Sequence, residues 1–134
     1  TVEEAVREAD LVCTVTATRE PVLHGAWLQP GTHVNAVGAC FSTSRELDTE
    51  AIVASRCFVD CRESAMNESG DLLIPMKEGA IDESHIVGEI GSILAGTIAG
   101  RVEPEEITLF KSLGVAVEDI AAANVILARA RSRA

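Results

Sequence analysis

The sequence has few aromatic residues, little basic charge and no long apolar run. Aromatics make up 3% of the 134 residues and tyrosine is missing, so any core must be aliphatic, as in layered α/β proteins. Nucleic-acid binding needs a basic face and stacking aromatics, and the net charge here is −10. The longest apolar window, 86–100, contains Glu89 and is too short to span a bilayer. We therefore expect one domain or less that is cytoplasmic and binds neither nucleic acid nor membrane.

The sequence also lacks a cysteine pattern for disulfides or zinc. Of its four cysteines, Cys57 and Cys61 flank an apolar pair. In an extended segment they would be roughly 13 Å apart, whereas a disulfide needs Cα atoms within about 7 Å. Cys13 lies inside another strand-like run, so we expect it to be a small buried hydrophobic residue. With no C-x-x-C pair or His/Cys cluster, we expect no metal site.

Apolar runs alternate with amphipathic stretches along the chain. They predict strands near 11–16, 33–37, 57–60 and 107–111. They predict helices at 1–9, from 45 or 48 to 54, at 62–68, from about 83, and at 115–131. The helix before residue 54 follows a capping-box spacing at 43–46, and 71–79, with Pro75, is expected to be a loop. Strands that alternate with helices need crossovers, so we expect a parallel sheet with both faces covered.

The predicted fold is the second half of a doubly wound, Rossmann-like α/β sheet, with strands 11–16, 33–37 and 57–60 as parallel neighbours. The phosphate-binding pattern G-x-G-x-x-G of a first half is missing, and so is the acidic residue that follows it. The strand at 33–37 ends at Gly38-Ala39-Cys40. Ligands of open α/β sheets bind beyond the carboxyl ends of the strands, so this is where we expect the chemistry.

Four stretches together resemble the ornithine cyclodeaminase/mu-crystallin family. They follow one another in the family's order and cover nearly the whole chain: EPVLHGAWLQPGTHVNAVGA at 20–39, RELD at 45–48, ESGD at 68–71 and FKSLGVAVED at 110–119. Members of the family are homodimers with a Rossmann domain and a domain for substrate binding and dimerisation. With NADH or NADPH they reduce imines or oxidise amines.

The resemblance implies that this chain is the C-terminal part of such a protein. Residues 1–111 would be the second half of the NAD(P)-binding domain. Residues 112–134 would form a C-terminal helix that returns toward the missing substrate and dimerisation domain. The phosphate-binding glycine turn and the residues for the substrate carboxylate would lie upstream. The partners implied are a small imino-acid or amino-acid substrate and a second copy of the chain.

Matching positions imply a cofactor site spread over three segments. Its residues would be Thr14, Val15, Thr16, Ala17, Gly38, Ala39, Cys40, Lys111, Ser112 and Leu113. The first four would border the cofactor, 38–40 would lie near the nicotinamide and the substrate, and Leu113 would pack on the nicotinamide ring. From the residues alone, the two threonines also suit a strand. Likewise, Lys111-Ser112 also suits a strand end followed by a helix N-cap.

Cys40 is where the sequence departs from the cyclodeaminases, which carry an aspartate there; mu-crystallin-type ketimine reductases carry a small polar residue. A thiol with a pKa near 8.5 does not replace an ionised carboxylate at neutral pH. We therefore expect reduction of cyclic ketimines, with Cys40 at the catalytic position. The alternatives are an ornithine cyclodeaminase or alanine-dehydrogenase-like enzyme and a non-catalytic crystallin-type protein that binds NADPH or thyroid hormone. A redox-active Cys40 is a further interpretation, but no His or Lys lies next to Cys40 in the sequence to support it.

Overall fold

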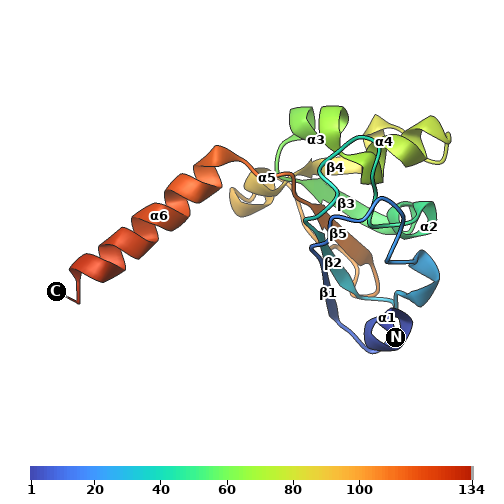
Figure 1. The fold of residues 1–134 in the computed structure, drawn as a ribbon, viewed down its shortest axis with the longest axis horizontal. Coiled ribbons are helices and arrows are strands. Elements are labelled where there is room, and N and C mark those ends of the chain that lie inside the picture. Colours follow the sequence, from blue (N-terminus) through green and yellow to red (C-terminus); the bar gives the residue numbers. More distant parts are fainter. Residues whose placement is uncertain (134) are drawn as a thin grey trace.

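Five parallel strands form a single sheet. The structure is a computed structural model that describes residues 1–133. The strands are β1 (Leu11–Thr14), β2 (His33–Ala36), β3 (Ser55–Val59), β4 (Ile86–Glu89) and β5 (Ile107–Lys111). Their order in the sheet is β1-β2-β5-β3-β4, and every neighbouring pair is parallel (Figure 1). The α/β class and the parallel sheet are therefore confirmed.

The order of the strands differs from the prediction at the centre of the sheet. β1 and β2 are neighbours, but β5 lies between β2 and β3. β5 is buried on both of its faces, because Thr108 and Leu109 point to opposite faces and both are buried. Such a strand lies between two others rather than at the edge of a sheet.

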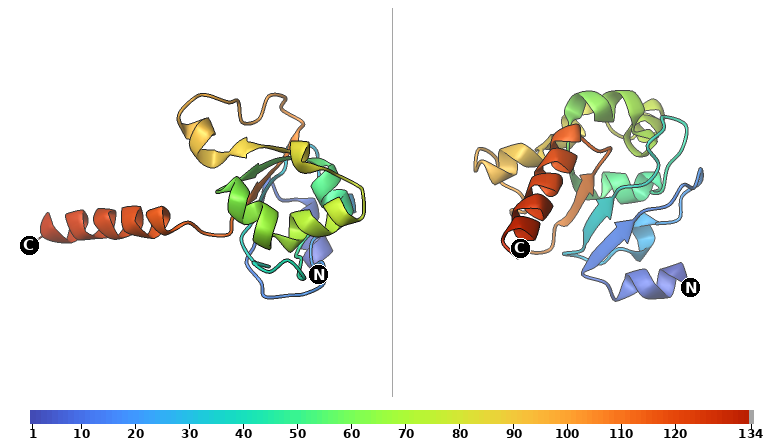
Figure 2. Two further views of the ribbon diagram at one scale, coloured as in Figure 1. Left: turned by 90° about the horizontal axis from the view of Figure 1, so that it is seen from above. Right: turned by 60° about the vertical axis from the view of Figure 1, so that its left-hand side comes forward.

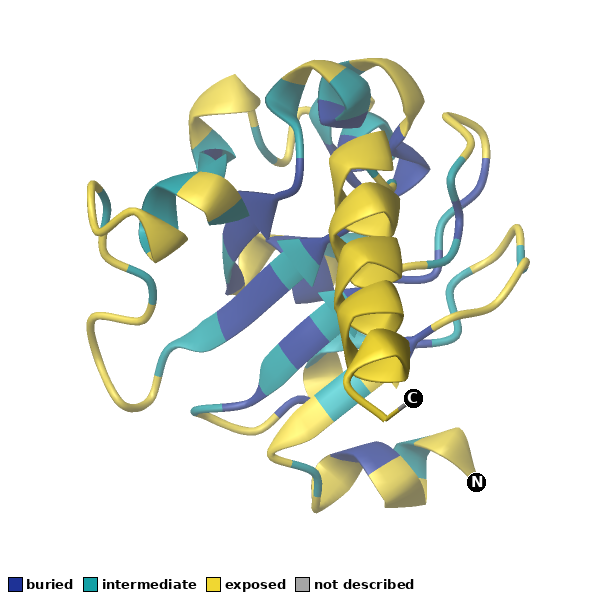
Figure 3. Ribbon diagram, turned by 90° about the vertical axis from the view of Figure 1, so that its left-hand side faces the viewer, coloured by how far each residue is buried: buried dark blue, intermediate teal, exposed yellow. Residues whose placement is uncertain are grey.

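One face of the sheet is covered by helices and carries the core. These are α1 (Val2–Arg7), α2 (Thr49–Val53), α3 (Arg62–Glu68) and α4 (Gly70–Lys77), with the short 3₁₀ turn η1 (Gly25–Trp27). Alternate residues of the strands, such as Val34, Ala36 and Leu109, pack against buried side chains of these helices. In Figure 3 the dark blue of buried residues is concentrated in the sheet and the inner sides of these helices.

The other face of the sheet is only partly covered. It carries the cross-strand row Cys13, Asn35, Phe110 and Phe58. The helix α5 (Ile90–Leu94) and the segment after it lie over part of this face and enclose a hollow of about 380 Å³. Cys13 is exposed, so its prediction as a buried residue is wrong: it points to the face that is only partly covered. Likewise, helices were expected to cover both faces of the sheet, but this face is covered only in part.

Two segments form other secondary-structure elements than the sequence predicts. Instead of a helix from Glu83, the chain forms the 3₁₀ turn η2 (Glu83–His85), strand β4 and then α5. The spacing of Ile86, Ile90 and Ile93 imitates a helical stripe, but Ile86 pairs with Cys57 in the sheet. Residues 71–79 were expected to be a loop because of Pro75, yet this proline lies inside α4.

The last helix, α6 (Ala116–Arg131), extends away from the rest of the chain (Figures 1 and 2). None of its residues is buried. Its large apolar side chains are therefore exposed, namely Val117, Ile120, Val125, Ile126 and Leu127. The helix itself was predicted correctly, but within residues 1–133 nothing covers its apolar residues. No helix in the described part of the chain is long and apolar enough to cross a membrane.

Candidate functional site

All three predicted cofactor segments lie at the carboxyl end of the sheet. Thr14, Ala36, Lys111 and Val59 form one cross-strand row, the last row of β1, β2, β5 and β3. The segments 15–17, 38–40 and 112–113 follow directly. A hollow of about 210 Å³ lies between the ends of β1 and β2, and its lining residues are Thr16, Ala17, Thr18, Gly38, Ala39, Cys40, Phe41 and Ser44. Lys111, Ser112 and Leu113 lie outside this lining.

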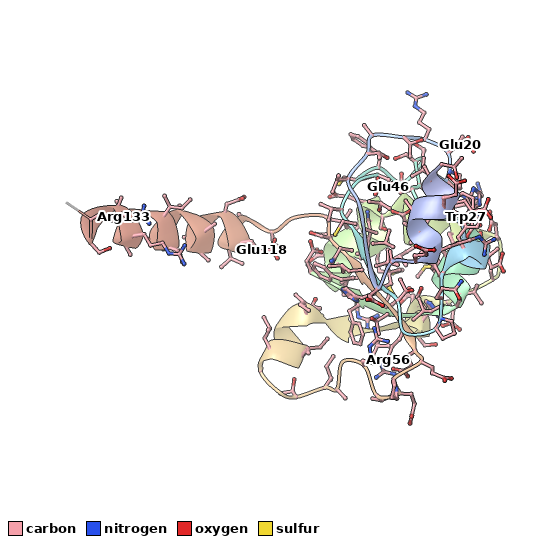
Figure 4. All side chains as sticks on the ribbon, turned by 90° about the horizontal axis from the view of Figure 1, so that it is seen from below. Glu20, Trp27, Glu46, Arg56, Glu118 and Arg133 are labelled. Carbon is pink, nitrogen blue, oxygen red and sulfur yellow. The ribbon has the colours of Figure 1, made fainter. Side chains whose placement is uncertain are left out.

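A buried glutamate fixes the segment after β1. Glu46 has no exposed surface and lies inside the body of the domain in Figure 4. Its carboxylate accepts hydrogen bonds from the Thr14 hydroxyl at 2.6 Å and from the Thr16 N–H at 2.5 Å. The capping-box spacing at 43–46 predicted that Glu46 belongs to a helix cap, but the N-cap of α2 is Asp48. Since the Thr14 hydroxyl is taken by Glu46, the Thr14 side chain serves first to anchor the strand end.

The backbone at Gly38-Ala39-Cys40 adopts an unusual conformation close to other main-chain groups. A Cβ at Gly38 would overlap the Thr16 carbonyl oxygen and the Glu46 side chain, so a glycine is needed at this position. Ala39 has φ +53°, in the left-handed region. Non-glycine residues in this region are found preferentially where a site constrains the backbone. The Cys40 thiol is half-buried and lies 3.5 Å from the Val37 carbonyl oxygen.

Lys111 supports the same segment from within the core. Its ammonium group donates to the Gly38 carbonyl oxygen and lies 3.1 Å from the Asp71 carboxylate, and neither side chain has exposed surface. The other Asp71 oxygen accepts from the N–H groups of Glu46 and Leu47 at 2.8 and 3.0 Å. Burial raises the pKa of the Asp71 carboxyl, and the Lys111 ammonium opposes that rise. Lys111 therefore acts on the site through the Gly38 carbonyl.

A second buried carboxylate, Asp60, fixes the segment after β5. It accepts from the Ser112 hydroxyl at 3.1 Å and from the N–H groups of Leu113 and Gly114, each at 2.6 Å. Val115, rather than Ser112, is the N-cap of α6. Asp60 was missing from the predicted site residues, although an aspartate directly after a buried parallel strand is a recognisable signal.

Small and neutral groups dominate the rim around Cys40. The buried charged side chains behind the Gly38 segment, Glu46, Asp71 and Lys111, are hydrogen-bonded within the protein. The exposed Glu68 lines a separate hollow together with Cys40. No three His, Cys, Asp or Glu side chains in residues 1–133 are grouped so that they could hold a metal ion. A rim of small, neutral residues at the ends of two neighbouring strands suits the binding and orientation of a flat ring.

Comparison with known proteins identifies the family. The profile of the ornithine cyclodeaminase/mu-crystallin family matches residues 1–134. The chain belongs to this family. It is 46% identical over 128 residues to the Δ1-pyrroline-2-carboxylate reductase of Bacillus cereus, which covers 95% of this chain and 39% of the relative. It is also 46% identical over 125 residues to mouse ketimine reductase mu-crystallin, covering 93% and 37%.

A solved structure of a family member shares the fold. It is that of the Thermococcus litoralis Δ1-pyrroline-2-carboxylate reductase in complex with NADH and L-proline. Its TM-score is 0.91 at 46% identity, with 98% of this chain and 41% of the other covered. The resemblance to this family drawn from the sequence is thus confirmed. The chain spans about two fifths of the length of the curated relatives it matches.

Proposed function

We propose that the complete natural protein reduces cyclic ketimines to cyclic amino acids with NADH or NADPH. The observation that carries the proposal is the neutral Cys40 at the rim, where the family's cyclodeaminases are expected to carry an aspartate. Glu46 and Asp71, the buried carboxylates behind the Gly38 segment, are engaged in hydrogen bonds. They are therefore not free to replace that aspartate as a base. The two 46% identical relatives described above are both imine reductases by name.

The site residues fit part of a nicotinamide cofactor. Ligand pockets usually measure about 300–1,000 Å³, and the hollow of about 210 Å³ between Thr16 and Cys40 suits one ring of a dinucleotide. Gly38 permits close approach of the strand ends that form the hollow, because a Cβ there would overlap the Thr16 carbonyl oxygen. When bound, the cofactor supplies the hydride. We propose that 14–17 border it and that Leu113 packs on its nicotinamide ring. The substrate would then lie beside Cys40.

The exposed α6 supports a two-domain, dimeric organisation. Its uncovered apolar residues, among them Ile120 and Ile126, are more numerous than the single, scattered apolar residues that the surface of a monomer ordinarily exposes. We propose that residues 112–134 pack against the substrate and dimerisation domain of the complete protein, and that 1–111 form half of its nucleotide-binding domain. The four cysteines are unpaired, which supports a location in the reducing cytoplasm.

The function is tested by comparing substrates in three forms of the protein. For wild type, Cys40→Ser and Cys40→Asp, three rates are measured: consumption of NADH or NADPH with Δ1-pyrroline-2-carboxylate, release of ammonia from ornithine in the presence of NAD+ or NADP+, and formation of NADH or NADPH from alanine and the oxidised cofactor. Serine is small and neutral, so Cys40→Ser should keep most of the ketimine reductase kcat/KM. Aspartate places a negative charge beside an anionic substrate, which costs several kcal/mol when desolvated, so Cys40→Asp should lose at least about tenfold.

Three results would contradict this proposal. Wild-type turnover of ornithine at a rate comparable to that of the ketimine would show that Cys40 does not exclude deamination. Oxidation of alanine as the main activity would indicate an alanine-dehydrogenase-like enzyme. Binding of NADPH with no turnover of any of the three substrates would favour a non-catalytic binding protein.

A further inference from the structure

Asp60 connects two strand ends that are far apart in the sequence. It follows β3 directly, and one carboxylate oxygen accepts from the N–H of Cys61 at 2.7 Å. The other oxygen accepts three hydrogen bonds, from the Ser112 hydroxyl, the Leu113 N–H and the Gly114 N–H. Both oxygens are therefore used, and three of the four donors belong to the connection between β5 and α6.

Apart from the hydrogen bond that the Ser112 N–H donates to the Ala36 carbonyl oxygen at 2.9 Å, this connection has little else to fix it in residues 1–133. The helix after it, α6, has no buried residue, and Gly114 has φ +86°, with open space around the position of a Cβ. Leu113 is only partly buried, although it packs against the edge of the core. The direction of the Leu113 main chain is thus set by the hydrogen bonds to Asp60 rather than by packing of the helix.

We propose that Asp60 is a positioning residue for the cofactor, an inference that rests on the proposed function. Its carboxylate holds the main chain at Leu113 so that the leucine side chain packs on the nicotinamide ring. Two of its hydrogen bonds come from the main-chain N–H groups of Leu113 and Gly114, each at 2.6 Å. The carboxylate does not touch the reacting atoms. It acts through Leu113.

Asparagine at this position has the same shape but only one acceptor oxygen. In Asp60→Asn, an NH₂ group must face either the N–H of Cys61 or the three donors of the connection. One set of donors then loses its partner, and the charge that strengthens the remaining bonds is gone. Glu63→Gln is the matched control, because it makes the same exchange of a carboxylate for an amide at an exposed position of α3.

The experiment uses the complete natural protein. The Kd for NADH is measured by fluorescence, and kcat and KM are measured with Δ1-pyrroline-2-carboxylate, for wild type, Asp60→Asn and Glu63→Gln. We expect Asp60→Asn to raise the Kd for NADH about tenfold and to lower kcat, with the KM for the imine unchanged. Glu63→Gln should leave the Kd as in wild type. If Asp60→Asn does not fold, Asp60→Glu displaces the same carboxylate by one methylene, and the same shift in Kd is expected.

A purely structural role predicts a different result. It would lower the Tm and the fraction of active protein but leave the Kd of the folded molecules as in wild type. That outcome, or equal effects of Asp60→Asn and Glu63→Gln, would overturn the inference while the proposed function stands. A wild type that does not bind NADH would overturn both.

Discussion

Lys111→Met is the substitution from which we expect the largest loss of stability. The Lys111 ammonium and the Asp71 carboxylate lie 3.1 Å apart without exposed surface. At an effective dielectric constant of about 20, two unit charges at that distance attract by about 5 kcal/mol. Most of this attraction is offset by the lost hydration of both ions. Removing one partner, however, leaves the other charge buried and uncompensated, which costs about 3–5 kcal/mol.

The loss should depend on pH in a defined direction. Burial already raises the Asp71 pKa, and without the Lys111 ammonium it should rise further. A carboxyl whose folded pKa lies above its unfolded value of about 3.9 stabilises the fold at low pH, and that contribution is lost as the pH rises through the folded pKa. The destabilisation by Lys111→Met should therefore be smaller at about pH 5 than at about pH 8.

The assay is urea unfolding of residues 1–134, followed by the fluorescence of Trp27, which is the single tryptophan and packs against the core. Lys77→Met, at an exposed position in α4, is the matched control and should change the free energy of unfolding by less than about 0.5 kcal/mol. Adding Asp71→Asn to Lys111→Met removes the stranded charge and should restore about 1–3 kcal/mol at about pH 8. A loss by Lys111→Met of under about 1 kcal/mol, or an equal loss at both pH values, would refute the reasoning.

Two further predictions concern Leu113 and Cys57. In the complete natural protein, Leu113→Asp places a carboxylate against an apolar ring face, so the Kd for NADH should rise about tenfold to a hundredfold. Leu113→Met is the control, and an unchanged Kd for Leu113→Asp would remove the residue from the site. Burial raises the pKa of the Cys57 thiol to about 12, so in native residues 1–134 this thiol should resist iodoacetamide while the exposed Cys13 reacts. Peptide mapping that finds equal labelling of both before unfolding would contradict the burial of Cys57.

The identity of the local elements follows in large part from the sequence. The runs that form β1, β2, β3 and β5 are short and apolar and lie between turn residues, which is a local property of the chain. The strand end at Gly38 was recognisable because glycine permits close approach of main-chain groups. Family resemblance added the three cofactor segments. Thr14 and Lys111, which belong to two of them, lie in one cross-strand row at the carboxyl end of the sheet.

Tertiary contacts decided what the local pattern left open. Ile86 could belong to a helix or a strand by spacing, and only pairing with Cys57 makes it part of β4. The place of β5 between β2 and β3 depends on burial of both of its faces, which no local pattern specifies.

The partners of the buried charges were equally out of reach of the sequence. Asp60 is recognisable by its place after a strand, but its donors in the connection after β5, and the donors to Glu46, are 30 or more residues away. A charged side chain without exposed surface is stable only where such distant partners meet it. The sequence therefore determined which residues reach the rim of the sheet. Only the folded chain determined which buried charges hold them there.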